Sequence, residues 1–315
     1  MKHYVEDLKW EKGMSVNKLV EEMGGLGFQS VHLNKAKDVI IKMKKNGAKI
    51  YFTFTSNMVT SGLRGLFAQL IKLNLVDVVV TTVGGIEEDI MRAQGEKFLV
   101  GSFKADDFGL HEKGFNRVGN LLIKNESYEK FETNMKQMLK KVYDKKKRVS
   151  VSELLKELGS QLKDENSILY QAHKNNIPIF CPAITDGAFG FHLYLFQQDH
   201  KDFIVDVVQD FFNLICTTDQ DELKGLIALG GGVSKHHAIL GALINGGLDY
   251  AVYLTTSHSS SGSMSGATTK EAKSWGKIKD DASASTLIGE VTITFPLIIF
   301  SVLDQLAEEG LIKNE

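Results

Sequence analysis

The sequence contains few cysteines, few prolines and no excess of either charge. Its 315 residues include only two cysteines, Cys181 and Cys216, and three prolines. Two cysteines cannot form a disulfide framework, which favours a reducing compartment, and their spacing is not that of a zinc site. We therefore expect no metal site and interpret both cysteines as small, buried hydrophobic residues.

Export signals and long apolar runs are also missing. The N-terminal MKHYVEDLKWEKGM has no apolar signal core, and no uninterrupted apolar run is long enough to span a membrane. The apolar segment at 292–306 contains Pro296, so a buried helix is expected there. A net charge of −2 gives no general attraction to nucleic acid or anionic lipid, and the basic run at 140–148 is typical of a solvated helix end. These absences predict a cytoplasmic protein that binds neither nucleic acid nor membrane.

Short β-branched runs alternate with helical patterns along the chain. Five strands are predicted, at 50–55, 76–82, 178–181, 226–229 and 250–255. Helical spacing of apolar residues occurs at 63–71, 203–215 and 238–245. The alternation predicts an α/β fold, with a doubly wound, mainly parallel sheet and helices on both faces. No linker divides the chain, so we expect one domain over 1–315, with a helical N-terminal extension at 1–49 and a core at 50–315.

Each predicted strand runs into a polar or glycine-rich loop. The five loops are SNMVTSG (56–62), VGGIEED (83–89), ITDGAFG (184–190), GGGVSKHH (230–237) and TSHSSSG (256–262). The carboxyl ends of parallel strands meet at one edge of a sheet, so these loops predict a ligand site there. Glycines let the backbone approach a phosphate, but no strict GxGxxG is present, and any one loop could be a tight turn.

Several ionisable residues in these loops have two interpretations each. Glu87, Glu88 and Asp89 could hold a cationic amine or a ribose hydroxyl, or they could be acids that favour the first turn of a helix. His236 could accept a proton or be a polar residue at a helix start. Asp186 could be a turn residue or a cofactor ligand. The residues alone leave these alternatives open.

The stretch KSWGKIK (273–279) places one of the two tryptophans beside a lysine. A lysine held against an aromatic wall loses hydration and can act as a nucleophile. The stretch can equally be a surface turn with no chemical role. Trp275 and Lys277 are therefore a candidate pair that needs support from the rest of the chain.

Longer strings resemble the deoxyhypusine synthase family, in the same order along the chain. The segments are TSNMVTSG, VDVVVTTVGGIEED, GFNRVGNLLIKNESYEKFE, IPIFCPAITDG, LGGGVSKHH, DYAVYLTT and EAKSWGKI. The resemblance covers the chain from about residue 50 to the end and identifies it as a member of that family. Several of these strings are long and specific, so they carry far more weight than the glycine motifs.

The resemblance implies a Rossmann-like, NAD-binding homotetramer with active sites at subunit interfaces. The family oxidises spermidine, passes its aminobutyl unit as an imine to an active lysine, and transfers it to a lysine of the translation initiation factor 5A precursor. By position, Lys277 is the nucleophile and His236 the base. The residues that the resemblance assigns to the amine pocket are Glu87, Glu88, Glu271, Trp275, Gly262 and Ser263. The residues that the resemblance assigns to the NAD site are Ser56, Asn57, Thr60, Thr82, Gly84, Glu88, Asp186, Gly231, Thr256, Ser257 and Glu290.

The chain departs from the family pattern where pocket aspartates are expected. Those positions hold Phe191, Ser261 and Met264, and the family's Asp-Ala pair beside the cofactor reads Glu290–Val291. Losing two charge-assisted hydrogen bonds would weaken polyamine binding by on the order of a hundredfold. Three interpretations follow: a deoxyhypusine synthase with a rearranged pocket, a related enzyme using agmatine or putrescine (the homospermidine-synthase type), or an inactive NAD-binding partner subunit.

Overall fold

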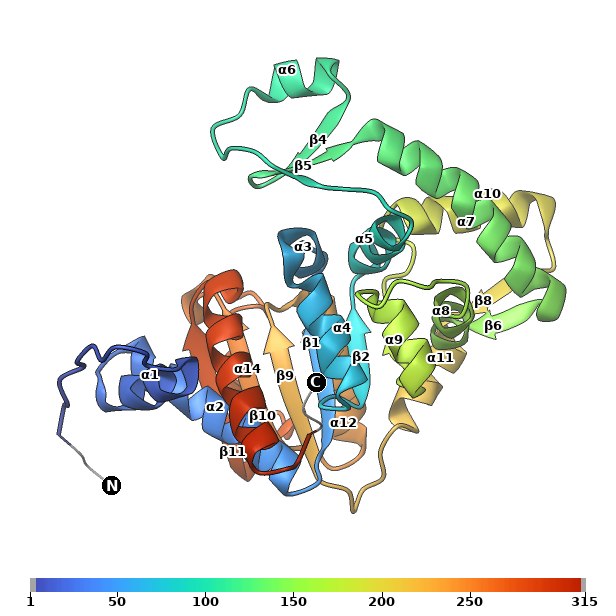
Figure 1. The fold of residues 1–315 in the computed structure, drawn as a ribbon. Helices are drawn as coiled ribbons and strands as arrows, with labels where there is room; N and C mark the ends of the chain where they lie inside the picture. The colour runs from blue at the N-terminus through green and yellow to red at the C-terminus, as the bar shows by residue number, and fades with distance from the viewer. Residues whose placement is uncertain (1–3, 313–315) are drawn as a thin grey trace. The chain divides into compact units, whose positions relative to one another are not determined.

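The chain divides into two units, each built from separate stretches of sequence. A computed structural model describes residues 4–312 (Figure 1). Among these, the first unit contains the residues up to Phe54, Leu73–Val80 and the residues from Leu214 on. The second unit contains Thr55–Lys72 and Thr81–Asn213. The expected single domain over 1–315 stays a prediction.

The first unit is built on a parallel sheet. Its strands are β1 (Lys49–Phe54), β2 (Val78–Thr81), β9 (Lys224–Leu229), β10 (Leu248–Thr255) and β11 (Ile278–Ile288). They lie in the order β11–β10–β9–β1–β2, and the pairs β1–β9, β9–β10 and β10–β11 are parallel. Every residue of β2 and β9 is buried, as expected for strands covered on both faces. The predicted α/β class with a mainly parallel sheet is confirmed.

Helices cover both faces of this sheet. They are α2 (Gln29–Lys45), α12 (Gly232–Ile244), α13 (Thr269–Lys273) and α14 (Val291–Glu308), and α1 (Val16–Glu22) packs on α14 and α2. Phe52 of β1 stacks on Phe295 of α14, with ring centroids 6.0 Å apart. The hydroxyl of Tyr51 lies 3.0 Å from the hydroxyl of Thr218, whose carbonyl accepts a hydrogen bond from Asn245 after α12. Since neighbouring strand residues point to opposite faces, α14 and α12 lie on opposite sides of the sheet.

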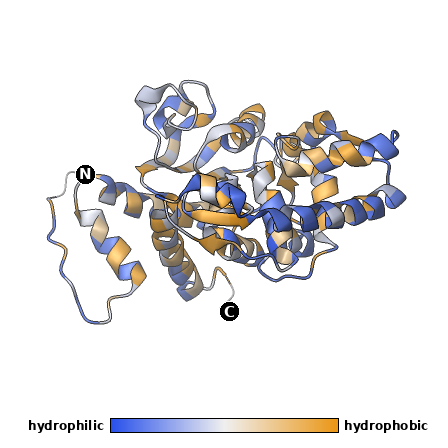
Figure 2. Cartoon of the chain, turned by 90° about the horizontal axis from the view of Figure 1, so that it is seen from above, coloured by the Kyte–Doolittle hydropathy of each residue, from blue (hydrophilic) through white to orange (hydrophobic). Residues whose placement is uncertain are grey.

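The second unit contains most of the helices and two small groups of strands. Its helices are α3 (Ser56–Met58), the π-helical turn η2 (Val59–Leu63), α4 (Arg64–Lys72), α5 (Val83–Ala93), α6 (Asp107–Glu112), α7 (Asn125–Lys145), α8 (Val151–Gly159), α9 (Ile168–Asn175), α10 (Ala188–Asp199) and α11 (Val207–Ile215), the last of which ends beyond the boundary. Its strands are β3 (Leu99–Val100), β4 (Phe115–Val118), β5 (Leu121–Lys124), β6 (Arg148–Ser150), β7 (Ile179–Phe180) and β8 (Ile204–Asp206). Strands β3, β5 and β4 form an antiparallel sheet, and β6 pairs with β8 in parallel. Many helices carry both hydrophobic and hydrophilic residues, which is the amphipathic pattern of helices that cover a core (Figure 2).

The five predicted strands correspond to β1, β2, β7, β9 and β10, with their ends shifted by at most two residues. The helices expected at 63–71, at 238–245 and within 1–49 are also present. The helix expected at 203–215 is wrong at its start, because 204–206 pair as β8 before α11 begins. Strand β11 was not predicted, because its sequence IKDDASASTLI is rich in small and polar residues.

Two further expectations concern the C-terminal segment and the cysteines. The segment around Pro296 forms α14, which is long and apolar enough by length and composition to cross a membrane. Phe295, Ile298 and Val302 of α14 are nevertheless fully buried in the first unit. Cys181 is buried as expected, but Cys216 is exposed, so that prediction is wrong for the second cysteine.

Candidate active site

Lys277 lies in a cavity of the first unit, where α13 turns into β11. This Lys277 cavity has a volume of about 220 Å³. Its lining includes three basic groups, one carboxylate and an apolar wall: Lys235, His236, Lys277, Glu271, Tyr253, Met264 and Trp275. Lys277 is only 8% exposed, and its Nζ lies 5.0 Å from the centroid of the Trp275 ring, within cation–π distance. The lysine and tryptophan of KSWGKIK therefore face each other at a cavity.

The position of Lys277 follows from how α13 ends. Gly276 adopts φ +67°, the left-handed conformation in which glycine closes a helix. The N–H of Lys277 then donates to the carbonyl of Ala272 at 3.1 Å, and its own carbonyl accepts from Leu248 N–H at 3.0 Å. These two bonds fix the backbone of Lys277 between α13 and the start of β10. The stretch is a helix-ending turn, and that turn presents the lysine to the cavity.

Two further basic groups of the cavity come from the first turns of α12. Lys235 is almost fully buried, lies 4.6 Å from the centroid of the Tyr253 ring, and donates to the carbonyl of Ala267 at 3.2 Å. Burial lowers the pKa of Lys235 to about 8. Burial, and then the charges of Lys277 and Lys235, lower the pKa of His236. A neutral His236 imidazole is therefore favoured near neutral pH and can accept a proton.

Lys235 was not among the predicted site residues. It precedes His236 in GGGVSKHH, where the glycines and histidines are the residues that indicate a ligand site. A lysine in the first turn of a helix is ordinarily solvated, so no local pattern indicates that this one lies in a cavity. Its burial depends on Tyr253 of β10 and the carbonyl of Ala267, which are distant in sequence.

The loops at the carboxyl edge of the first unit's sheet pack closely on one another. A Cβ atom on Gly231 would lie 2.3 Å from Cα of Ser265, so only glycine fits there. The hydroxyl of Thr255 donates to the carbonyl of Ser265, and the Thr255 carbonyl accepts from Gly289, one residue before Glu290. The predicted cofactor residues gathered at this edge are Gly231, Thr256, Ser257 and Glu290. Gly262 and Ser263 are instead on the exposed part of the loop that follows β10.

The start of α12 offers room for a phosphate-bearing ligand. Gly232, the first residue of this 13-residue helix, has φ +72°, and no atom lies within 4 Å of where its Cβ would be. The first N–H groups of a helix have no partner within the helix, and the helix dipole favours an anion near them. The residues present at this edge therefore fit the pyrophosphate of a dinucleotide.

A second group of predicted residues forms a buried acidic cluster in the second unit. Glu87 and Glu88 of α5 are 6% and 7% exposed. Glu87 accepts a hydrogen bond from the N–H of Phe189 at 2.8 Å, and burial raises its pKa. Glu88 accepts from the hydroxyl of Thr60 at 2.5 Å, and burial raises its pKa to about 7, with the charge of Glu87 adding to the rise. Buried carboxylates with raised pKa values are typical of functional sites.

Other predicted cofactor residues lie around this Glu87–Glu88 cluster. The N–H of Ser56 donates to the hydroxyl of Thr82 at 2.9 Å, and a Cβ on Gly84 would come within 2.8 Å of the Ser56 side chain. A Cβ on Gly187 would lie 2.3 Å from Oε1 of Glu87, so the loop carrying Asp186 packs directly against that carboxylate. The predicted residues that the structure brings together here are Ser56, Asn57, Thr60, Thr82, Gly84, Glu87, Glu88 and Asp186.

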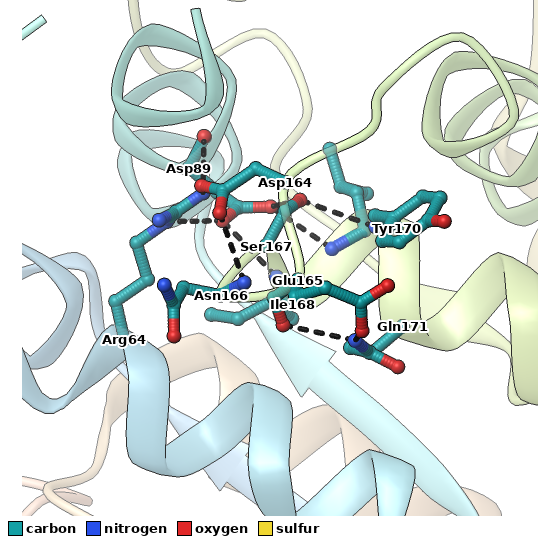
Figure 3. A network of polar contacts seen from close by, with 10 residues as sticks. Arg64, Asp89, Asp164, Glu165, Asn166, Ser167, Ile168, Tyr170 and Gln171 are labelled. Atoms are coloured by element: carbon teal, nitrogen blue, oxygen red, sulfur yellow. Dashed lines mark hydrogen bonds and ion pairs between the residues drawn. The ribbon is translucent and has the colours of Figure 1, made fainter. Parts of the chain in front are cut away.

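Asp89, the third acid of the same string, has different surroundings (Figure 3). It is fully buried and accepts a hydrogen bond from Nε of Arg64 at 2.6 Å. It also accepts from the hydroxyl of Ser167 at 2.8 Å and from the N–H of Leu169 at 2.9 Å, in the first turn of α9. Arg64 pairs in addition with Asp164, at 2.7 Å. Asp89 thus joins α5 to α4 and to the start of α9, which is a structural role.

The positions that depart from the family pattern are also located. Met264, 40% exposed, lines the Lys277 cavity, whose lining in the described part of the chain includes a single carboxylate, Glu271. Ser261 is exposed on the same loop. Phe191, on α10 of the second unit, is 56% exposed and stacks on Tyr194 with centroids 6.3 Å apart. The cavity wall therefore presents a thioether where the resemblance led us to expect a carboxylate.

Comparison with known proteins places this geometry in context. The family model for deoxyhypusine synthase matches residues 18–302. The chain is 38% identical to a "Probable deoxyhypusine synthase" of Schizosaccharomyces pombe, over 91% of this chain and 87% of that protein. It is also 38% identical to a "Probable deoxyhypusine synthase" of Thermoplasma volcanium, over 94% and 96% of the two chains. The crystal structure of a "putative deoxyhypusine synthase" from Entamoeba histolytica superposes with a TM-score of 0.67 at 28% identity, covering 95% and 97% of the chains.

Proposed function

The chain belongs to the deoxyhypusine synthase family of transferases, and we propose that it catalyses NAD-dependent transfer of the aminobutyl group of spermidine. The acceptor in this proposal is a lysine of the translation initiation factor 5A precursor. The observation that carries the proposal is the Lys277 cavity. There a buried lysine faces an indole ring, and the lowered pKa of the neighbouring His236 favours its neutral imidazole. We further propose that the enzyme is a cytoplasmic homotetramer with active sites at subunit interfaces.

The amine chemistry requires a lysine that can lose its proton. Lys277 is buried against Trp275, and two further basic groups, Lys235 and His236, line the same cavity. A neutral amine is the nucleophile in imine formation, and His236, whose pKa is lowered by burial and by the charges of Lys277 and Lys235, lines the same cavity as a proton acceptor. Glu271, held by its backbone N–H to the side chain of Thr268 at 3.2 Å, is positioned to receive a cationic end of the substrate.

The proposed sequence begins at the secondary amine of the polyamine. His236 accepts the proton that this nitrogen loses as its neighbouring carbon is oxidised to an imine. Nζ of Lys277 then attacks the imine carbon, and the bond from that carbon to the original nitrogen breaks, releasing the rest of the polyamine as a diamine. The aminobutyl unit is now an imine on Lys277. The acceptor lysine displaces Nζ of Lys277 in the same way, and reduction of the new imine completes the transfer.

NAD would supply the redox chemistry, because no side chain can accept a hydride and return it. The open space at Gly232 and the close packing at Gly231 fit a dinucleotide at the carboxyl ends of the first unit's strands. Glu88, with its raised pKa, would be held near the cofactor, together with Thr60. These residues bind and orient the cofactor in the proposal.

Met264 supports a second candidate function. A cavity lined by three basic groups and one carboxylate suits an amine with fewer positive charges than spermidine. The alternative is therefore a related enzyme that keeps the Lys277 chemistry with putrescine, agmatine or a small diamine acceptor. The third interpretation, an inactive partner subunit, has no observation in its favour, since the candidate nucleophile and base lie in one cavity.

Covalent trapping tests the proposal directly. The protein is incubated with NAD and, in separate reactions, with spermidine, putrescine or agmatine, then reduced with borohydride and digested for peptide mass spectrometry. An aminobutyl adduct on Lys277 from spermidine supports the first function. An adduct from another amine alone supports the second. No adduct from any amine, with NAD still bound in a separate titration, would contradict both.

A further inference from the structure

The outer edge of the first unit's sheet is formed by β11, and the second half of this strand has no neighbouring strand on its outer side in the part of the chain that the structure describes. β11 pairs only with β10 in the strand order of this sheet (Figure 1). Residues 282–288 contain no charged residue and no proline, the features that usually block an exposed edge. The irregular pairing of β11 with β10 lies before this stretch, so the edge continues in regular register through Ile288.

The hydrogen-bonding groups of this edge can be assigned from the register. Thr255 pairs with Ile288, and the N–H of Gly289 donates to the Thr255 carbonyl. In a parallel pair the N–H and C=O of alternate residues face the partner strand, so those of Ala284, Thr286 and Ile288 face away from β10. The N–H of Ile288 donates a hydrogen bond to the side-chain oxygen of Gln29 at 2.9 Å. Within residues 4–312, no side chain or loop carbonyl accepts a hydrogen bond from the backbone N–H of Ala284 or Thr286, and the register turns both groups away from β10.

A groove of about 620 Å³ runs along this edge. Every residue from Ala282 to Thr286 contributes to its lining. Consecutive residues of a strand point to opposite faces, so an uninterrupted run can line one groove only if the groove follows the backbone edge. The space therefore lies beside the unpaired N–H and C=O groups.

The walls of the groove are basic. His32 and Lys35 come from α2, and Lys270 and Lys273 come from α13. No acidic residue of the described chain is among those lining the groove. Lys273 donates to the carbonyl of Asp280, whereas Lys35 and Lys270 are exposed and form no ion pair or hydrogen bond with other described residues. Nδ1 of His32 is buried and has no hydrogen-bond partner.

We propose that this groove binds an extended, acidic segment of a partner protein, which pairs as an added strand along β11. The unpaired backbone groups would bond the segment's main chain, and the lysines of α2 and α13 would face its carboxylates. This form of recognition needs a free edge for affinity and alternate side-chain contacts for specificity, and the groove offers both. The proposal does not depend on the chemistry of Lys277 and would stand if that chemistry failed.

Peptide binding tests the proposal. The probe is a fluorescein-labelled peptide of about eight residues that alternates glutamate and valine, followed by fluorescence anisotropy with the full chain at low salt. We expect this peptide to bind, and the same peptide with lysine in place of glutamate not to bind. A third peptide, N-methylated at alternate residues, keeps its charge but cannot donate along one edge. Its binding should fall at least tenfold, because added-strand pairing requires those donors.

Variants locate the site on the protein. Lys35→Glu combined with Lys270→Glu should weaken peptide binding roughly tenfold or more, whereas Lys141→Glu, an exposed charge reversal on α7, should not. Ala284→Pro removes an N–H from the free edge without removing a bond to β10, and it should weaken binding while thermal unfolding stays cooperative. If Ala284→Pro fails to fold, the lysine variants and the N-methylated peptide still test whether the peptide binds as an added strand in this groove.

Three outcomes would overturn the proposal. Equal binding of the N-methylated peptide would mean simple charge attraction. Equal loss in Lys141→Glu would mean that no particular surface is used. If no peptide binds and the lysine or proline variants change the oligomeric state in sedimentation analysis, the edge is instead an interface between copies of this chain.

Discussion

The Lys277 cavity and the Glu87–Glu88 cluster are built from opposite charges but follow the same physical rule. In the cavity, basic groups are buried with little carboxylate nearby, and the pKa values of Lys235 and His236 are lowered. In the cluster, two carboxylates are buried with hydrogen bonds from neutral donors, and the pKa of Glu88 is raised to about 7. Each region is shifted toward the neutral form, because burial penalises charge of either sign when no counter-charge compensates.

The Asp89 network shows what the chain does where a charge is purely structural. Asp89 is more deeply buried than its neighbours Glu87 and Glu88, yet it is paired with Arg64 and receives three further hydrogen bonds from the start of α9. The contrast within VGGIEED teaches that burial alone does not mark a site. Burial without a full set of partners does, and that combination defines both candidate regions.

The largest effect should come from the nucleophile itself. Lys277→Arg keeps the positive charge but removes the primary amine that can form an imine, so the borohydride-trapped adduct should disappear. The matched control is Lys279→Arg, two residues away, where Lys279 pairs with Asp249 at 2.7 Å. An adduct that persists in Lys277→Arg and maps to Lys235 would show that the two lysines of the cavity have exchanged roles.

The next effect distinguishes paired from unpaired burial. Asp89→Ala leaves Arg64 buried beside Asp164 alone and should lower the free energy of unfolding by about 3–5 kcal/mol. Asp107→Ala removes an exposed partner of Arg117 and should lower the free energy of unfolding far less, because solvent screens this ion pair. Urea unfolding of both variants measures the difference. Comparable losses would mean that the network in Figure 3 is no more than a surface ion pair in its energetics.

How far the sequence predicted the molecule depends on the strength of local signals. Strands such as β1 and β9 are almost wholly apolar or β-branched and were found within two residues. β11 was missed, because a strand rich in alanine and serine has no hydrophobic alternation to detect. Its residues 282–288 are half-buried or buried against α2 and α13, so contacts with segments distant in sequence hold it at the sheet edge.

The candidate site was predictable in part for a different reason. Glycines at strand ends and the KSWGKIK string indicated where ligand chemistry could occur, and most of those residues do gather in the two regions. The pairing of Lys235 with Tyr253 and of Asp89 with the start of α9 joins residues far apart in sequence. No local pattern distinguishes Asp89 from Glu88, since their difference lies in which neighbours each one faces.

The pH dependence of stability tests the Glu87–Glu88 cluster. The pKa of Glu88 rises from 4.5 to about 7 on folding, so the folded state binds its proton more tightly than the unfolded chain. The raised pKa does not change the free energy of unfolding below pH 4.5. Between pH 4.5 and about 7 it lowers this free energy increasingly, and above about pH 7 the loss is complete and constant. Glu88→Gln should therefore stabilise the protein at pH 8 by at most about 3 kcal/mol and have little effect at pH 4.5.

The control for this measurement is Glu129→Gln on α7, where the carboxylate is exposed. Its effect on the free energy of unfolding should be small and the same at both pH values. If Glu88→Gln behaves like Glu129→Gln, the carboxylate of Glu88 has found a compensating partner in solution. The statement that burial favours the neutral form in both regions would then be wrong for the Glu87–Glu88 cluster.

The smallest effect concerns substrate charge in the Lys277 cavity. Met264→Asp adds a second carboxylate to the cavity lining, where Glu271 is the only acidic residue among those described. A new charge-assisted hydrogen bond contributes about 1.5–3 kcal/mol, so the KM for spermidine should fall roughly ten- to a hundredfold. Putrescine, with fewer charges, should gain less, and Met264→Leu should change neither. If Met264→Asp leaves the ratio of the two KM values unchanged, then the cationic end of the substrate does not reach this wall, and the basic character of the cavity is not what selects the amine.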